Sequence, residues 1–393
     1  MNILIVSNGH GESAIAGYLG SALLERAPGA RVEHFPLVGE GGDPPPGLAV
    51  VGPRAQMPSG GLVAYWNLEN LARDISAGLL GLIGRQFAYL RRQGERDVIV
   101  AVGDVFCLAA CLLFARRATV FVATAKSQYV ASHSRLECAI ARHARIAFAR
   151  DAATAHSLSE HGVNARFAGN LMMDGVAVSK EPEARLQPLD STALHVGVLP
   201  GSRDDAQANA AAAIRRVRLI AGMLAPRRLQ ALVSVAPGVL VQTVLDGIES
   251  SGVSVERMAD GGCVAASGAS DGLEVLAMNG CFGELLRASD IVLGQAGTGN
   301  EQAAGLGKPV IASSSALGGR LGWYRMRQQR LLGDALLVLP DDDREFASGV
   351  AALLADSARM LAMSRTGRER MGGPGGSKAV AEAVLALASE SSV

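Results

Sequence analysis

The sequence predicts an α/β protein built from two doubly wound, Rossmann-like domains that face a cleft. Three observations predict this class. Short runs of aliphatic and β-branched residues alternate with Ala- and Leu-rich helical segments, a glycine-containing turn follows the first run of each half, and the pattern restarts near residue 195. Continuous apolar runs separated by helices are typical of parallel strands that are covered on both faces. A length of 393 residues suits two domains.

The first half alternates expected strands with helices. Strands are expected at 2–7, 31–35, 98–102 and 119–123, and a glycine-rich turn and a helix to about Arg26 follow the first of them. The polar segment 179–192 contains two prolines and five charged residues and is the expected linker. We therefore place the first domain at 1–180.

The second half repeats the pattern. Strands are expected at 195–199, 231–235, 291–293 and 309–312, and a glycine-rich turn and helix span 295–306. An Ala-, Val- and Leu-rich helix is expected after the glycine-rich segment 372–377. These limits place the second domain at 190–370 and leave 371–393 as a C-terminal helix.

Composition excludes several classes of protein. The chain has 37 Lys and Arg against 37 Asp and Glu, so no net positive charge attracts nucleic acid. Hydrophobic residues make up 49% of the chain, which is enough to bury large cores and excludes disorder as the main state. Met1 leads directly into an apolar strand, and no apolar stretch reaches the roughly 18 residues of a membrane span. We expect a cytoplasmic protein without a nucleic-acid partner.

The first candidate site is the turn SNGHGES, directly after the first strand. Gly9 and Gly11 let backbone N–H groups approach an anion or a sugar, and Glu12 completes the candidate binding set. Gly9, Gly11 and Glu33 also fit a dinucleotide-binding fingerprint, which keeps an NAD(P)-dependent oxidoreductase as an alternative. One interpretation of His10 is functional: it faces the ligand and acts as a hydrogen-bonding group or as a general base. The alternative is that His10 is only a solvated histidine of the turn.

Asp104 follows the expected strand at 98–102 and precedes the apolar segment VFCLAACLLFA. In an open parallel sheet, ligands bind beyond the carboxyl ends of the strands, so a carboxylate here can accept a proton from a sugar hydroxyl. An aspartate is also a common cap of a following helix. The sequence leaves both interpretations open.

The third candidate is the turn LPGSRDD at 199–205. Ser202 and Asp205 form an S-x-x-D pattern, which is a plausible capping box. Arg203 opposes the helix dipole unless an anion binds between them. The turn of Gly201, Ser202 and Arg203 therefore predicts phosphate binding.

The segment GQAGTGNEQAAGLGKP gives the most specific signal in the chain. Gly297, Thr298 and Gly299 place backbone donors and a hydroxyl at the start of a helix, which suits a diphosphate. Glu301, one turn further, can accept hydrogen bonds from two ribose hydroxyls. The alternative is a T-x-x-E capping box of Thr298 and Glu301, which would still leave other N–H groups for a ligand. The candidate binding residues of this turn also include Gln295 and Asn300.

LPGSR together with GQAGTGNEQAAGLGKPVI resembles the lipid-A-disaccharide synthase family and, more broadly, the GT-B glycosyltransferases. SNGHGE and ATAKSQY look closer to a subgroup described as lipid-A-disaccharide-synthase-related. The resemblance covers most of the chain and is strongest at the two C-terminal turns. It implies a GT-B fold in which 1–180 lies on the acceptor side, 190–370 binds the nucleotide sugar and the C-terminal helix packs back on the first domain.

The resemblance also implies roles for the residues that match the family's motifs. Asp104 looks like the counterpart of a catalytic aspartate, although this chain has GDVFCL where the synthases have an aspartate followed by Phe-Asn. The opening SNGHGE also departs from the synthases, and both departures concern the acyl-glucosamine substrates rather than the glycosyl transfer. The implied UDP contacts are Gly297, Thr298 and Gly299 with the diphosphate, Glu301 with the ribose, and Gly201, Ser202 and Arg203 near the phosphates.

The implied reaction is an inverting transfer of an N-acetylglucosamine-type hexose from a UDP-sugar to a lipid-linked or amphipathic acceptor. Asp104 or His10 would take the proton of the acceptor hydroxyl, while Arg203 and a helix start would stabilise the leaving UDP. No metal or other cofactor is expected, since the UDP-sugar is a co-substrate. A UDP-sugar 2-epimerase on the same fold is a further alternative.

Two basic and aromatic stretches bear on the acceptor. Segment 62–92 has apolar residues at helical spacing and four arginines, which is typical either of a helix lying on anionic lipid or of packing against the sheet. The segment RLGWYRMRQQR at 320–330 suits the acceptor side or lipid headgroups. Peripheral contact with the cytoplasmic face of the inner membrane is therefore an open expectation.

Overall fold

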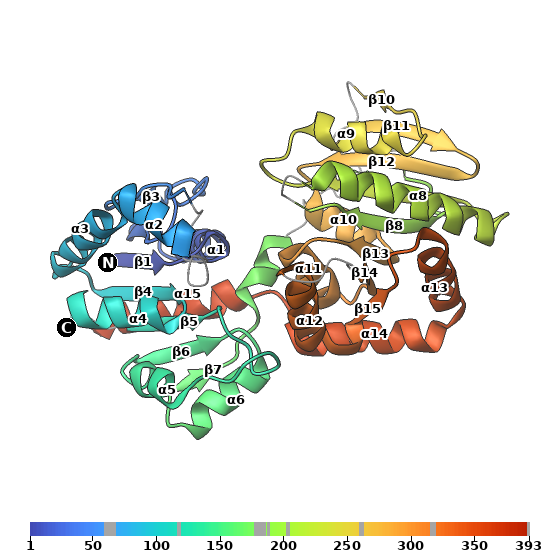
Figure 1. The fold of residues 1–393 in the computed structure, drawn as a ribbon. Helices are drawn as coiled ribbons and strands as arrows, with labels where there is room; N and C mark the ends of the chain where they lie inside the picture. The colour runs from blue at the N-terminus through green and yellow to red at the C-terminus, as the bar shows by residue number, and fades with distance from the viewer. Residues whose placement is uncertain are drawn as a thin grey trace. The chain divides into compact units, whose positions relative to one another are not determined.

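A computed structural model describes residues 1–58, 68–115, 119–176, 186, 189–201, 205–258, 263–314 and 320–390 (Figure 1). The chain forms two compact units. Unit 1 consists of Met1–Gly175 and Pro374–Val393, and unit 2 is the continuous segment Val176–Gly373. Each unit has helices on both faces of a largely parallel sheet, which confirms the predicted α/β class.

Unit 1 contains a parallel sheet in the order β3-β2-β1-β4-β5-β6-β7. Side chains alternate between the faces of a strand, so Ile3 and Ile5 pack into one core and Leu4 and Val6 into the other. The strands are β1 (Asn2–Ser7), β2 (Arg31–Pro36), β3 (Ala49–Val50), β4 (Val98–Gly103), β5 (Thr119–Ala123), β6 (Ile146–Ala149) and β7 (Ala165–Arg166).

Helices connect the strands of unit 1 and cover both faces of its sheet. They are α1 (His10–Arg26), α2 (Leu68–Ser76), α3 (Leu79–Arg91), α4 (Val105–Ala110) with the π-helical turn η2 (Cys111–Ala115), α5 (Arg135–Ala141), α6 (Ala152–Glu160), the 3-10 turn η3 (Leu171–Val176) and α15 (Gly376–Glu390). Although α15 ends the described chain, it packs against α1, and its buried Val380 and Val384 complete the core on that face.

Unit 2 contains the sheet β10-β11-β12-β9-β8-β13-β14-β15. Its strands are β8 (Leu194–Leu199), β9 (Leu229–Val235), β10 (Glu256–Arg257), β11 (Val264–Ser270), β12 (Leu273–Asn279), β13 (Ile291–Gly294), β14 (Val310–Ser313) and β15 (Leu336–Leu339). Its helices are α8 (Ala206–Leu224), α9 (Val241–Ser250), α10 (Phe282–Ala288), α11 (Thr298–Gly305), α12 (Arg320–Leu332) with the 3-10 turn η4 (Gly333–Ala335), α13 (Asp343–Ala355) and α14 (Ser357–Met371).

The expectation of parallel strands alone is wrong at one edge of unit 2. β11 runs antiparallel to β12, and only the residues Asp271 and Gly272 connect them. Both residues have positive φ, 46° and 77° respectively, as the tight turn of a two-residue hairpin requires. The edge strand β10 also runs antiparallel to β11, whereas β12 and β9 pair in parallel.

Strand order reverses at the same place in both units. In each unit, the strands that follow the first strand are added on one side of it. A later strand then pairs with the opposite side of the first strand, and the strands after it extend the sheet in that direction. The reversal lies between β1 and β4 in unit 1 and between β8 and β13 in unit 2. Ligands of doubly wound sheets bind beyond the carboxyl ends of the strands at such a reversal.

The described part of segment 62–92 forms two helices rather than the single helix considered for it. Gly78, with φ of +94°, separates α2 from α3. Leu71 and Ile75 of α2 are exposed while Asp74 is buried. The aromatic Tyr65 and Trp66 of this stretch lie outside the described residues.

Within the described residues, no single helix combines the length and apolar character of a membrane span. One pair of segments, Asp343–Ala355 and Ser357–Glu390, reaches that length and composition only when joined across a bend of 93°.

Candidate functional site

The turns after β1 and β4 meet at the strand-order reversal of unit 1. Because Ser7 of β1 pairs with Val102 of β4, the residues that follow the two strands are neighbours. The Asn8 side-chain amide donates to Asp104 Oδ1 at 2.6 Å, and Asn8 Oδ1 accepts from the Asp104 backbone N–H at 3.4 Å. A Cβ at Gly103, whose φ is +139°, would lie 1.8 Å from Asn8 Oδ1, so this close approach depends on glycine.

Asp104 also caps α4. Its Oδ1 accepts the Cys107 backbone N–H at 3.1 Å, which confirms the capping interpretation. The side chain is half-buried, and both hydrogen bonds described for it end on Oδ1. The arrangement holds the carboxylate at the edge of the sheet, and no hydrogen bond from the described residues ends on Oδ2. Its role as a base remains a prediction.

His10 is the first residue of α1 and is exposed. Its imidazole lies over Gly39, where an added Cβ would be 2.7 Å from Cε1. Gly11, the next residue of the helix, is exposed with open space around its α-carbon. Both predicted residues are thus accessible on the start of α1, at the same sheet edge as Asp104.

Two carboxylates argue against the dinucleotide alternative. Glu12 folds back over the start of α1, where a Cβ at Gly9 would lie 2.1 Å from its Oε2, and its Oε1 accepts the Thr124 hydroxyl at 3.4 Å. A pyrophosphate at this helix start would meet that negative charge. Glu33 lies inside β2, is 4% exposed and forms an ion pair with Arg96. It therefore does not face a ribose at the strand end.

The strand-order reversal of unit 2 brings two further predicted turns together. Gly294 of β13 pairs with Leu199 of β8, and the Gln295 N–H donates to the Leu199 carbonyl at 3.0 Å. Gly201 follows β8 with a φ of +103°, which favours glycine. The turn LPGSR and the glycine-rich turn of 294–299 therefore start side by side.

Ser202 and Arg203 lie outside the described residues, so their contribution to phosphate binding stays a prediction. The N-cap of α8 is Asp205 rather than Ser202, and its side chain makes no capping hydrogen bond. The expected S-x-x-D capping box therefore does not start this helix.

The start of α11 is open. Gly297 is its N-cap, no side chain in the described part of the chain caps the helix, and Thr298 is already its first helical residue. The capping-box alternative for Thr298 and Glu301 is therefore wrong. Gly297 and Thr298 are exposed, and Gly299 lies against Leu199, where a Cβ would be 3.3 Å from Cδ1. Uncapped N–H groups and the helix dipole make this a suitable anion site, with Glu301 one turn further.

Gln295 and Asn300 belong to a network that holds this turn against α12. Arg325 donates to Gln295 Oε1 at 2.5 Å and to Gln328 Oε1 at 2.7 Å. Gln328 Nε2 donates to two carbonyls of the turn at 3.2 and 3.0 Å. Asn300 is 0% exposed and donates to the Gly294 carbonyl and to Gln328. Asn300 therefore supports the backbone of the turn, and its expected contact with a ligand stays a prediction.

Solved structures of similar fold span nearly the whole chain. MurG of Acinetobacter baumannii is 11% identical, with 98% of this chain and 99% of that chain covered and a TM-score of 0.55. A UDP-GlcNAc 2-epimerase from Neisseria meningitidis is 12% identical, with 98% and 100% covered and a TM-score of 0.55. The calicheamicin glycosyltransferase CalG4 is 16% identical, with 98% of each chain covered and a TM-score of 0.57.

The chain has the GT-B fold. No protein-family model and no curated protein matches it. The GT-B fold predicted from LPGSR and the glycine-rich turn is therefore confirmed, while nothing singles out the lipid-A-disaccharide synthases within it.

Sequence reasoning missed three residues of the two GT-B units. Asn8 directly follows β1 as Asp104 follows β4, so the strand order would have placed them together. Arg325 and Gln328 lie three residues apart on α12, a spacing that puts them on one helix face. Nothing in the sequence shows which turn that face would meet. Burial lowers the pKa of the Arg325 guanidinium from its usual value.

Proposed function

We propose that the protein is an inverting glycosyltransferase that moves a hexose from a UDP-sugar to a lipid-linked or amphipathic acceptor. The observation that carries this proposal is the uncapped start of α11 at the strand-order reversal of unit 2. Backbone N–H groups at such a helix start hold phosphate oxygens. Among the structures of similar fold, the Neisseria epimerase was solved with UDP-GlcNAc bound.

Unit 2 would hold the donor. The N–H groups at Thr298 and Gly299 would hold the diphosphate, and Glu301 would accept hydrogen bonds from the ribose hydroxyls. As the bond to the sugar breaks, negative charge grows on the UDP, and the helix start stabilises it. Arg203 and Gly201, on the neighbouring turn, would contribute a positive charge and a backbone donor.

Unit 1 would hold the acceptor. Asp104 Oδ2 would remove the proton of the acceptor hydroxyl as this oxygen attacks the anomeric carbon, because Oδ1 is already engaged by Asn8 and Cys107. His10 is the second candidate for this base, being exposed at the same sheet edge.

Exposed apolar side chains support an amphipathic acceptor and contact with the inner membrane. Leu71, Ile75 and Leu80 are 38%, 44% and 65% exposed on α2 and α3. The exposed arginines Arg73 and Arg85 lie on the same two helices. Apolar residues interleaved with cations suit the interface of an anionic membrane.

Calorimetric titration with UDP tests the donor site. We expect Glu301→Gln to weaken UDP binding by about tenfold or more, because a carboxylate accepts hydrogen bonds more strongly than an amide. The matched control is Glu345→Gln, since Glu345 occupies the first turn of α13, which follows β15 of the same sheet. Absence of UDP binding by the unaltered protein, or equal loss in both variants, contradicts the proposal.

Incubation of the unaltered protein with UDP-GlcNAc and extracted membrane lipids tests the reaction, with formation of a glycolipid as the measured product. Asp104→Asn should keep the affinity for UDP, because Asp104 lies in unit 1, while glycolipid formation stops. We expect a transfer without a metal ion, so EDTA should leave the rate of glycolipid formation unchanged.

A UDP-sugar 2-epimerase is the second candidate, because the structures of similar fold include epimerases as well as transferases. Product analysis without any acceptor separates the two. Formation of the 2-epimeric UDP-sugar, or of the free 2-epimeric sugar and UDP where water cleaves the bond between them, would identify the epimerase.

A further inference from the structure

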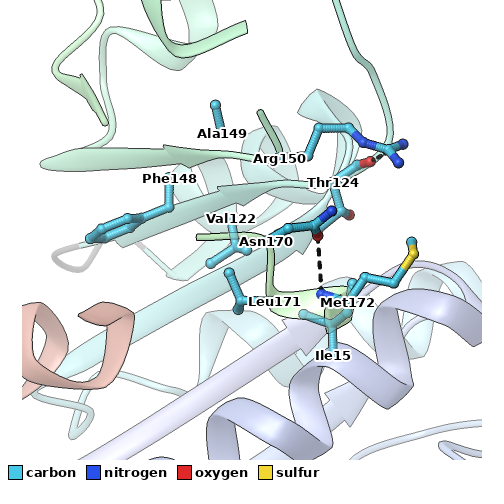
Figure 2. A pocket seen from close by; sticks show the side chains of 9 residues that line it. All are labelled: Ile15, Val122, Thr124, Phe148, Ala149, Arg150, Asn170, Leu171 and Met172. Carbon is cyan, nitrogen blue, oxygen red and sulfur yellow. Dashed lines mark hydrogen bonds between the residues drawn. The ribbon is translucent and has the colours of Figure 1, made fainter. Parts of the chain in front are cut away.

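The pocket of unit 1 that Figure 2 shows suits a water molecule rather than a ligand. It lies beyond the ends of β5 and β6 and has room for about one water molecule. Asn170 Nδ2 has no hydrogen-bond partner within the described residues, and such a water would accept its hydrogen bond. The Glu12 carboxylate accepts the hydroxyl of Thr124, which lines the pocket, so an anion is disfavoured there. Evidence for a bound anion comes instead from Arg325 in unit 2.

Arg325 of α12 is a half-buried cation with neutral hydrogen-bond partners. Its guanidinium donates to Gln295 Oε1 at 2.5 Å and to Gln328 Oε1 at 2.7 Å. Burial lowers the pKa of the guanidinium, and no carboxylate of the described residues lies close enough to oppose this shift. The positive charge is therefore held partly away from water without an anionic partner from the described part of the chain.

Other buried arginines of this protein have such a partner. Arg96 forms an ion pair with Glu33, and Arg216 forms one with Asp343 at 2.7 Å. Moving a cation out of water costs free energy, which a nearby anion offsets. For Arg325, a bound anion would provide the compensation that carboxylates provide for the other two.

The partners of Arg325 belong to the turn at the start of α11. Gln295 lies in this turn, and Gln328 Nε2 donates to the carbonyls of Ala296 and Gly297 at 3.2 and 3.0 Å. Gly297 is the N-cap of α11, so the guanidinium and the positive end of the helix dipole lie at the same turn. Two positive groups at one turn repel each other unless an anion binds beside them. A diphosphate compensates both groups better than a ligand with less negative charge.

We propose that Arg325 is the counter-charge of a diphosphate group bound at the start of α11, and that it makes unit 2 prefer diphosphates to less charged ligands. Arg325 is a positioning residue, since it reaches the turn through Gln295 and Gln328. The identity of the ligand as UDP rests on the proposed glycosyl transfer. Binding of inorganic pyrophosphate rests only on the turn and on Arg325, so the two can fail separately.

Calorimetric titration of the full chain with inorganic pyrophosphate and with UDP tests this role. Arg325→Gln keeps an amide donor and removes the charge, and we expect it to weaken binding of both ligands by about tenfold or more. Arg325→Lys should recover most of the affinity, because it restores a positive charge. The matched control is Arg327→Gln, which removes the same charge from α12 at a guanidinium that lies 4.6 Å over the Trp323 ring. It should leave both affinities unchanged.

Gln295→Glu provides a second test with two readouts of opposite sign. It places a carboxylate at the position that accepts the hydrogen bond from Arg325. We expect pyrophosphate binding to weaken by about tenfold or more, because Arg325 is then neutralised from within the protein. The melting temperature without ligand should rise by about 2–4 °C, since the half-buried cation gains a partner. A network that only holds the shape of the turn does not predict this gain in stability.

The outcomes are distinct. The proposal is overturned if the unaltered protein binds neither ligand, if Arg325→Gln and Arg327→Gln bind alike, or if Arg325→Lys binds as weakly as Arg325→Gln. Should Arg325→Gln fail to fold, Gln295→Glu decides, and a melting temperature that does not rise overturns the proposal. Pyrophosphate binding that depends on Arg325, without binding of UDP, removes only the assignment of the nucleotide.

Discussion

At the scale of single residues, His34 couples the stability of unit 1 to pH. Its side chain is 1% exposed inside β2, and its Nε2 lies 2.8 Å from the Ser7 hydroxyl. Burial, with a smaller contribution from the positive charge of Arg54, lowers the pKa of His34 from 6.5 to about 4. The folded state therefore resists protonation, while the unfolded chain accepts a proton near the ordinary value.

The resulting prediction has a defined sign and window. Above pH 6.5 both states are neutral at this residue and full stability is present; as pH falls from 6.5 towards 4, the unfolded state gains a proton first and stability is lost. Between about pH 7.5 and 4.5 we expect the free energy of unfolding to fall by about 2.5 kcal/mol more than in His34→Gln, at about 1.4 kcal/mol per unit of pKa. Urea unfolding at both pH values measures this difference, with His156→Gln as the exposed control. The prediction is refuted if the free energy of unfolding falls by the same amount between the two pH values in the parent protein and in His34→Gln.

The candidate residues show what local sequence does and does not reveal. Gly297 and Thr298 could be placed at a helix start because a strand, a glycine-rich turn and a helix are consecutive in the chain. The burial of Asn300 could not be foreseen, since it depends on Arg325 and Gln328 from a later helix. A polar residue in a motif can bind a ligand itself, or it can support the backbone that binds the ligand. Only its contacts with residues distant in the chain show which of the two roles it has.

At the scale of elements, α15 depends on a cap from a distant segment. The carboxylate of Asp174 accepts the backbone N–H groups of Gly375 and Ser377 at 2.5 and 2.8 Å, although about 200 residues separate them in the chain. Asp174→Ala leaves these donors unpaired, and we expect it to destabilise unit 1 by about 1–2 kcal/mol. Hydrogen exchange should then accelerate in α15 and not in α14. Asp356→Ala, which removes the N-cap of α14 in unit 2, is the matched control and should give the reverse pattern.

Most elements could be predicted because their signals are local. The expected strands at 2–7 and 119–123 coincide with β1 and β5, and the helix to Arg26 with α1. The hairpin of β11 and β12 was missed although Asp271 and Gly272 form a typical two-residue turn, because the alternation of strands and helices elsewhere favoured parallel pairing. The cap from Asp174 lies beyond such reasoning, since it joins residues that are close only in the folded chain.

At the scale of the whole molecule, the two units differ in how the chain builds them. Unit 2 is one continuous segment whose core, from Leu194 to Met363, lies within it. Unit 1 needs both ends of the chain, because Val380, Ala381, Val384 and Ala388 of α15 are fully buried in the core of α1 and the sheet. Removing α15 would expose the apolar surface of α1 and the sheet to water, at a free-energy cost that grows with the exposed area.

This difference predicts opposite behaviour for the two separated pieces. Segment 176–373, expressed alone, should fold and bind UDP with the affinity of the full chain, because the start of α11, the turn of Gly201 and the supporting Arg325 all lie within it. Segment 1–175 alone should be unfolded or aggregated and should regain structure when segment 374–393 is joined to it through a short linker. Circular dichroism and calorimetry on the three proteins measure these outcomes. If segment 176–373 folds with a cooperative melting transition and still binds no UDP, residues of unit 1 belong to the donor site, and the assignment of the nucleotide to α11 alone is wrong.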